Sequence, residues 1–219
     1  MIARAAFAVA ALLLAGAGSA DAATKLSTFK LGCYCEALRE VLTKDDVKEI
    51  EKLPAQVTLT LDRVKGSPVA PDDPGAIAVA KRIEHGNFDG GFYKVKAGTR
   101  ACTVYWYGFV DLATRASKQT CAVTRDGDRI SVATTSGDGL AVNLVPYLPG
   151  ALAFYGRTFL PDHKNRAYDK DVQSNPENDH FGNIVGLALA DKGHLTLVTI
   201  NERGLPAPSP IYFAVIQVD

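Results

Sequence analysis

The stretch LAVNLVPYLPGALAFYGRTFL, residues 140–160, decides the fold class. It contains two apolar runs that are separated by Pro149-Gly150, a dipeptide typical of tight turns. In the first run Leu140, Val142 and Leu144 occupy every second position, as expected for a strand with one buried face, and the second run repeats this spacing. Because the link is so short, the two strands must run antiparallel, and the stretch predicts a β-hairpin.

The same alternation of runs and turns recurs from Gly90 to the end of the sequence. Apolar and β-branched runs return every 8 to 12 residues, and turn residues lie between nearly every pair. We predict strands at 91–97, 101–110, 119–125, 129–135, 140–147, 151–160, 183–190, 194–200 and 211–218. Most of the links leave no room for crossover helices, so the strands are expected to form an antiparallel meander.

A flat meander of this length would expose two long edge strands. Closure of the sheet removes both edges. We therefore predict a mainly β fold, in which the meander closes into an up-and-down, lipocalin-like barrel. A β-sandwich is the alternative.

The segment before Gly90 has a different pattern. Helical spacing at residues 35–42 and helix-capping residues around 43–53 and 73–86 predict two or three short helices. Between them, apolar residues alternate with polar ones at 57–61, which is typical of a strand. We expect this helical segment to pack on the barrel.

Residues 1–22 have the features of a secretory signal peptide. Arg4 is followed by an apolar run and then by Ala20-Asp21-Ala22, an A-x-A cleavage site. The uncharged run is shorter than the roughly 20 residues that cross a bilayer. We expect a cleaved, periplasmic or secreted product without a membrane span, divided into a helical segment at 23–89 and a barrel domain at 90–219.

The charge balance limits the classes of partner. The chain has 24 basic and 24 acidic residues. This balance gives no electrostatic reason to expect nucleic acid as a partner. A small apolar ligand or a protein partner remains.

The four cysteines are Cys33, Cys35, Cys102 and Cys121. An oxidising compartment favours disulfides, and the sequence leaves all three pairings open. Alternatively, Cys33 and Cys35 form a redox or copper-binding pair, which requires an extended backbone because a helix would separate the two sulfurs.

Residues 27–30, Ser-Thr-Phe-Lys, match the S-x-x-K pattern of serine acylases. The enzymes that use this pattern also need S-D-N and K-T-G, but S-D-N is absent and the nearest approach to K-T-G is Lys96-Ala97-Gly98. No catalytic set is therefore evident.

The connection at 161–182 is rich in charged residues. Asp169 and Asp171 could supply oxygen ligands to a metal ion, and His163 and His180 could supply nitrogen ligands. The spacing fits no standard calcium loop, so a solvated connection is the simpler interpretation.

Aromatic residues cluster on the strand predicted at 101–110. Tyr105, Trp106 and Tyr107 could line a ligand cavity. Aromatic residues on a half-buried strand are more often core residues.

The motifs Gly91-Phe92-Tyr93, Thr120-Cys121-Ala122-Val123 and Thr135-Ser136-Gly137, together with residues 182–218, resemble an uncharacterised family of bacterial exported proteins, a domain of unknown function. The resemblance implies a secreted β-rich domain with Cys121 as a framework cysteine, and it implies no activity. The family pattern has a cysteine soon after Gly-x-Tyr, and Cys102 would be its displaced counterpart. Lipocalins are also similar, although Tyr93 stands where their G-x-W motif has Trp.

Together these features predict an exported binding or structural protein without a cofactor. The alternative is a thiol redox or copper-binding protein that uses Cys33 and Cys35.

Overall fold

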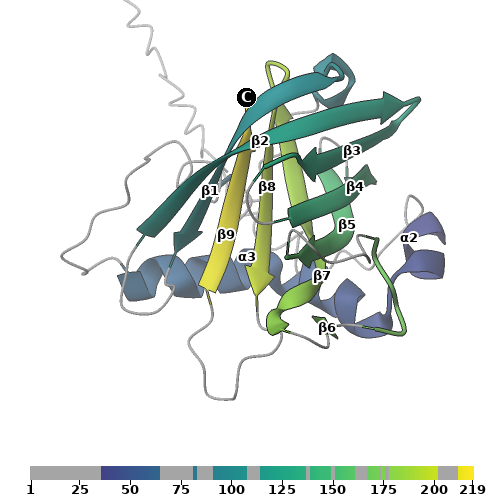
Figure 1. The fold of residues 1–219 in the computed structure, drawn as a ribbon. Coiled ribbons are helices and arrows are strands. Elements are labelled where there is room, and N and C mark those ends of the chain that lie inside the picture. The colour runs from purple at the N-terminus through teal and green to yellow at the C-terminus, as the bar shows by residue number, and fades with distance from the viewer. Residues whose placement is uncertain are drawn as a thin grey trace, which may run out of the picture.

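The computed structural model describes residues 36–64, 81–82, 91–107, 114–136, 139–148, 151–160, 167–172, 174–175, 178–201 and 212–219. They include the helices α2 (Glu36–Val41) and α3 (Lys44–Val64) and the short 3₁₀ helix η1 (Phe92–Lys94). The strands are β1 (Gly98–Tyr107), β2 (Thr114–Asp126), β3 (Arg129–Thr134), β4 (Gly139–Leu148), β5 (Ala151–Phe159), β6 (Ser174–Asn175), β7 (Asn178–Asp191), β8 (His194–Asn201) and β9 (Tyr212–Val218) (Figure 1).

The sheet closes into an up-and-down barrel. Its strand order is β5-β4-β3-β2-β1-β9-β8-β7, and the ring is completed by pairing of β5 with β7. Neighbouring strands are antiparallel throughout, and β6 adds only a short pairing to the start of β7. The predicted meander and its closure are confirmed, and the sandwich alternative is wrong.

Alternation along the strands divides the buried residues between two faces of the barrel wall. In β7, Ala188 and Ala190 belong to the cluster inside the barrel, whereas Leu187 and Leu189 belong to a second cluster outside it. The outer cluster also contains residues of α2 and α3. The wall on this side is therefore apolar on both faces, because the helices cover it.

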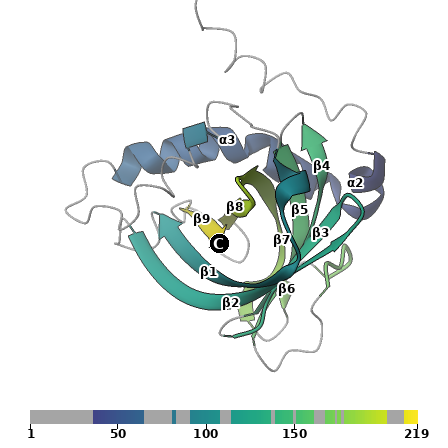
Figure 2. The same ribbon diagram turned by 90° about the horizontal axis from the view of Figure 1, so that it is seen from above.

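Helix α3 lies across the outside of β7, β8 and β9 (Figure 2). Its buried face includes Ile50, Leu53 and Val57, which have helical spacing and are at most 3% exposed. Thr43 caps the helix, as predicted: its Oγ1 accepts a hydrogen bond from the Asp46 amide (3.2 Å), and the Thr43 amide donates to Asp46 Oδ2 (3.1 Å).

The strand predicted at 57–61 is wrong, because these residues belong to α3. Val57 is fully buried but Leu59 is 63% exposed, so the two do not share a face as strand alternation would require. Pro54 lies inside the helix, and its carbonyl accepts a hydrogen bond from Thr58 Oγ1 (3.2 Å). Tertiary packing of the apolar face outweighs the weak helix propensity of this Thr- and Val-containing stretch.

The strand predicted at 91–97 is also wrong. This segment contains η1 and then leads without strand pairing into β1. Of the helix predicted at 73–86, only residues 81–82 are within the described residues, where they are helical. No helix in the described ranges has the length and hydropathy needed to cross a bilayer.

Candidate functional site

The two ends of the barrel are connected differently. At one end, called here the hairpin end, β2–β3, β4–β5 and β7–β8 are joined through residues 127–128, 149–150 and 192–193. At the opposite, long-loop end the connections are residues 108–113, 135–138, 160–177 and 202–211. Long connections at one end of a barrel are where binding residues concentrate, since the strands below hold them in place.

The hairpin end is sealed by the segment that precedes β1. Val95 is 2% exposed and belongs to the interior cluster. Gly91 approaches β7 so closely that a Cβ there would lie 2.7 Å from the Ala190 carbonyl oxygen. Arg125 Nη1 fixes this segment by donating to the carbonyls of Tyr93 (2.9 Å) and Val95 (3.2 Å).

The interior next to the hairpin end is a packed core. Ile130, Leu144 and Phe154 are all 0% exposed. A side chain that lined a water-sized cavity would keep accessible surface, so these residues border no such space. This part of the barrel has no room for a ligand.

The interior is less tightly closed towards the long-loop end. Val104 and Ala214 are 8% and 7% exposed, and Ser117 and Gln119 on β2 are only partly buried. The register pairs Ser117 with Val104 and Gln119 with Cys102. Because cross-strand partners share a face, both polar residues lie on the inner face of the barrel.

Two buried oxygen atoms in this region have no hydrogen-bond partner among the residues that the structure describes. They are Ser117 Oγ and Gln119 Oε1. A buried polar atom that is left unsatisfied costs about 1–3 kcal/mol, so such atoms commonly bind a water molecule or a ligand group. The arrangement can accept hydrogen bonds from a molecule that enters from the long-loop end.

A disulfide joins β1 and β2 next to these atoms, on the side of the hairpin end. It links Cys102 with Cys121, whose Cα atoms are 5.8 Å apart, and both side chains are at most 1% exposed. This is one of the pairings that the sequence left open. It removes both barrel cysteines as partners for Cys33 and Cys35, which lie outside the described residues.

A buried arginine lies on the outer face of the barrel wall near the long-loop end. Arg157 on β5 is 0% exposed, and its Nη1 donates to the Val172 carbonyl and to Asn183 Oδ1, both at 2.9 Å. The Asp169 amide donates to the same Asn183 oxygen (3.1 Å). Burial lowers the pKa of the Arg157 guanidinium, and the charge of Asp169 partly offsets this.

Tyr168 joins the same connection to helix α3. Its hydroxyl donates to Asp46 Oδ2 and accepts a hydrogen bond from the Thr43 amide (3.2 Å). Its ring meets that of Tyr155 edge-on, with centroids 5.8 Å apart. Residues 167–172 therefore hold the helix cap and the barrel together, rather than forming a solvated excursion.

The predicted metal ligands are only partly within the described residues. Asp169 Oδ1 accepts a hydrogen bond from the Asp171 amide (3.0 Å). His163 and the side chain of His180 lie outside the described residues. Among the residues that are described, no group of three or more potential metal ligands occurs.

The predicted aromatic ligand-binding residues are also divided. Tyr105 is half-buried and packs against the outer cluster that contains α2 and α3. Trp106 and Tyr107 lie on β1, but their side chains are outside the described part. Tyr105 therefore contacts the helical layer and does not line the barrel interior.

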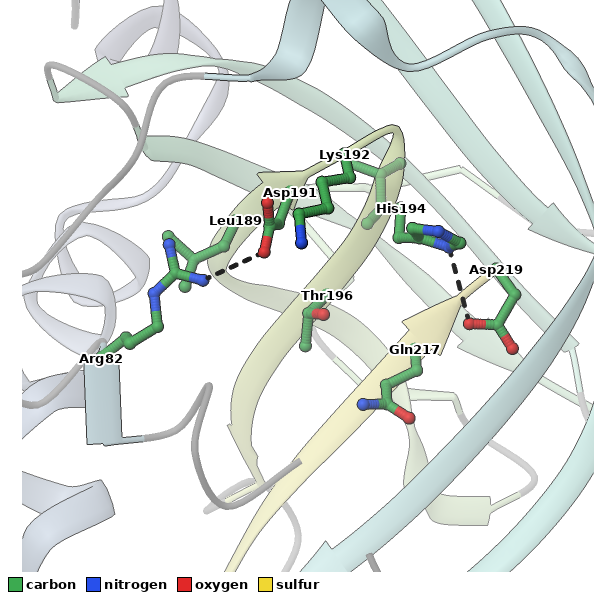
Figure 3. Close-up of a pocket in the computed structure, with 9 residues that line it drawn as sticks. Arg82, Leu189, Asp191, Lys192, His194, Thr196, Gln217 and Asp219 are labelled. Atoms are coloured by element: carbon green, nitrogen blue, oxygen red, sulfur yellow. Dashed lines mark ion pairs between the residues drawn. The ribbon is translucent and has the colours of Figure 1, made fainter. Parts of the chain in front are cut away.

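A pocket lies on the outer surface at the hairpin end (Figure 3). This pocket has a volume of about 280 Å³. It is lined by charged and polar groups, including Arg82, Asp191, Lys192, His194, Gln217 and Asp219. Arg82 Nη1 lies 3.9 Å from Asp191 Oδ2, and His194 Nδ1 lies 3.8 Å from Asp219 Oδ1.

Sequence reasoning missed both Ser117 and Gln119 and this outer pocket. One signal for the first pair is visible: both residues occupy alternate positions before Cys121, which places polar side chains on the same face as a buried cysteine. The pocket has no comparable signal, because its residues come from distant parts of the chain.

Comparison with known proteins finds no match to any family model, curated protein or solved structure.

Proposed function

We propose that the protein is an exported binding protein that takes up a ligand or partner at the long-loop end of its barrel and does not act by catalysis. The observation that carries this proposal is a pair of buried oxygens on the inner face of the barrel, Ser117 Oγ and Gln119 Oε1, for which the described part of the chain offers no hydrogen-bond partner. The sealed hairpin end leaves the long-loop end as the route of entry.

The chemistry of these atoms defines the ligand group. Gln119 Oε1 can only accept hydrogen bonds, so it requires a donor such as a hydroxyl or amide N–H. Val104 and Ala214 supply an apolar surround at the same end. A small, mainly apolar molecule with one donating head group satisfies both features.

Export is supported by the signal-like residues 1–22 and by the Cys102–Cys121 disulfide. Structural disulfides persist in oxidising compartments and are rare in the cytosol. We therefore place the protein in the periplasm or outside the cell.

Tryptophan fluorescence tests the binding site directly. Trp106 is the only tryptophan of the chain and lies two residues along β1 from Val104, the partner of Ser117. We expect 1-octanol to change its emission saturably and 1-methoxyoctane, which lacks the donor, to bind more weakly. The variant Gln119→Leu should remove this preference, whereas Thr124→Val, an exposed position on the same strand, should keep it. Equal responses to the two probes would contradict the site.

One observation favours a second candidate function, thiol redox or copper chemistry at Cys33 and Cys35. The disulfide occupies Cys102 and Cys121, so the remaining pair must form its own bond, stay reduced, bind a metal or pair with another molecule. This candidate predicts two titratable thiols in the unreduced, denatured protein and a stoichiometric Cu(I) complex. The complex should be lost in Cys35→Ser. A chain with no free thiol and no copper binding excludes copper chemistry, and a chain without insulin-reductase activity excludes the redox form.

A further inference from the structure

The two oxygens of the proposed binding site lie at its deep end. Ser117 and Gln119 precede Cys121 on β2, on the side of the long-loop end. The disulfide between Cys102 and Cys121 follows them, and both of its side chains are at most 1% exposed. Towards the hairpin end the interior continues with Val123, which is 2% exposed. A ligand that enters from the long-loop end therefore reaches the two oxygens last.

Apolar surface lies nearer the entrance than these oxygens. The register places Ser117, Val104 and Ile216 in one row across β2, β1 and β9. Ala214 lies two residues further along β9 towards the long-loop end. It belongs to the interior cluster and is 7% exposed. Polar groups deep in the barrel and apolar surface nearer its entrance fit a ligand whose polar end points inward.

The hydrogen-bonding capacities of the two side chains restrict the polar end further. The Ser117 hydroxyl has one donor and two lone pairs, whereas Gln119 Oε1 can only accept. Both atoms lack a hydrogen-bond partner within the part of the chain that the structure describes. The complementary group accepts a hydrogen bond from Ser117 and donates one to Gln119. A neutral hydroxyl does both, whereas an ammonium only donates and a carboxylate or an ether only accepts.

One hydroxyl can span the two side chains. Residues that are two apart on a strand lie about 6.8 Å from each other along it. A hydroxyl oxygen that makes two hydrogen bonds of about 2.8 Å bridges oxygens up to about 5.6 Å apart. The long side chain of Gln119 can bring its oxygen within this span of Ser117. A charged group would also lose more hydration energy than a hydroxyl beside Val104 and Ala214.

The strands end a short way from the two oxygens. β2 begins at Thr114, three residues from Ser117, which corresponds to about 10 Å along the strand. An alkyl chain longer than this distance extends past the strands. The far end of the ligand is therefore less restricted in shape than the end beside the disulfide.

We propose that the site binds an amphiphile with an unbranched primary hydroxyl end, and that this end enters first, accepts a hydrogen bond from Ser117 and donates one to Gln119. The tail points towards the long-loop end. This inference rests on the proposed function, and it adds the class of the head group and the orientation of the ligand.

Two isomeric alcohols test the orientation. The compounds 7-methyl-1-octanol and 2-methyl-2-octanol have the same composition, but the first is branched at the far end and the second beside the hydroxyl. In calorimetric titrations of the full-length protein, the first should bind as 1-octanol does. The second should bind about tenfold more weakly, because the packed residues beside the disulfide leave no space for its methyl groups. Equal affinities would overturn the orientation.

Charged compounds of the same chain length test the head group. Octylammonium and octanoate should each bind about tenfold more weakly than 1-octanol at pH 7, because each leaves one of the two oxygens without its complement. Binding of either ion as tightly as the alcohol would overturn the assignment of a hydroxyl.

Two variants separate the roles of the side chains. Ser117→Ala removes the donor, so it should weaken both 1-octanol and 1-methoxyoctane about fivefold. Gln119→Leu should weaken only the alcohol, since the ether makes no hydrogen bond to this oxygen. Thr124→Val, the exposed control on β2, should leave both affinities unchanged. An unchanged affinity of Ser117→Ala for the ether would overturn the role of Ser117.

Failure of this inference differs from failure of the proposed function. If the proposed function is wrong, none of these compounds binds saturably, and the inference falls with it. If 1-octanol binds but the isomers or the ions bind equally well, the site stands and the head-group class or the orientation is refuted.

Discussion

The two halves of the barrel interior are built from different residues. Next to the hairpin end, Ile130, Leu144 and Phe154 are fully buried and apolar. Towards the long-loop end, Ser117 and Gln119 face inward with buried oxygen atoms to which no described residue donates a hydrogen bond. One half of the same sheet thus has the packing of a protein core, and the other has unsatisfied polar groups.

The packed half of the interior contributes to stability, whereas the half with unsatisfied polar groups is suited to recognition. A packed apolar interior contributes hydrophobic free energy in proportion to the area that it buries, and it leaves no space for another molecule. Unsatisfied polar atoms weaken the fold, and they are retained where another molecule satisfies them. Truncation of the packed apolar residues should therefore lower stability, whereas replacement of the unsatisfied polar groups should not.

The largest effect is expected at Phe154. This side chain is 0% exposed and packs so closely over Gly186 that a Cβ there would lie 2.6 Å from its ring. Phe154→Ala should leave a cavity and lower the free energy of unfolding by about 3–5 kcal/mol, measured by urea denaturation.

A pair of identical substitutions provides the control for this comparison. Val132 in the packed half is 0% exposed, and Val104 towards the long-loop end is 8% exposed. Val132→Ala should cost more stability than Val104→Ala, because the packed surroundings relax less around the lost methyl groups. Equal losses would show that the two halves are packed alike, and the comparison would fail.

The packed half is also the part that the sequence predicts best. Val142 and Leu144 continue the alternation of their strand towards the hairpin end, and the dipeptide Pro149-Gly150 signals the link that follows. Both signals are local, so they can be detected without knowing what the strand packs against. The antiparallel order and the closure follow from them.

The errors occur where packing overrides a local pattern. Residues 57–61 alternate as a strand would, but their helix is stabilised by the outer face of the barrel. Residues 114–118 lack apolar alternation, yet they extend β2 because the end of β1 offers them pairing partners. Ser117 was missed for this reason, since the predicted strand began only at 119. The outer pocket joins Arg82 to β7–β9, which no local pattern can indicate.

A smaller effect is expected at Arg157, a buried polar group that has hydrogen-bond partners. Its Nη1 donates two hydrogen bonds, to Val172 and Asn183. Arg157→Met should lower the free energy of unfolding by about 2–3 kcal/mol, because the Asn183 oxygen and the Val172 carbonyl lose a charged donor. Thermal denaturation measures the loss, with Arg129→Met, at an exposed position, as the control. An unchanged midpoint would show that residues 167–172 do not depend on this side chain.

The smallest and most specific effect is expected at Gln119, where substitution should raise the free energy of unfolding or leave it unchanged. In the ligand-free protein, Gln119→Leu removes a buried oxygen that has no hydrogen-bond partner within the described ranges, and it adds apolar surface. The free energy of unfolding should stay constant or rise by up to about 1 kcal/mol, in contrast to the losses at Phe154 and Arg157. Urea denaturation with Thr124→Val as the exposed control measures this difference.

A loss above about 1 kcal/mol would mean that the oxygen is already satisfied in the free protein, for instance by a bound water, and that it has a structural role. A neutral or positive change combined with loss of the preference for 1-octanol would assign this oxygen to recognition, because its removal would then affect binding without weakening the fold.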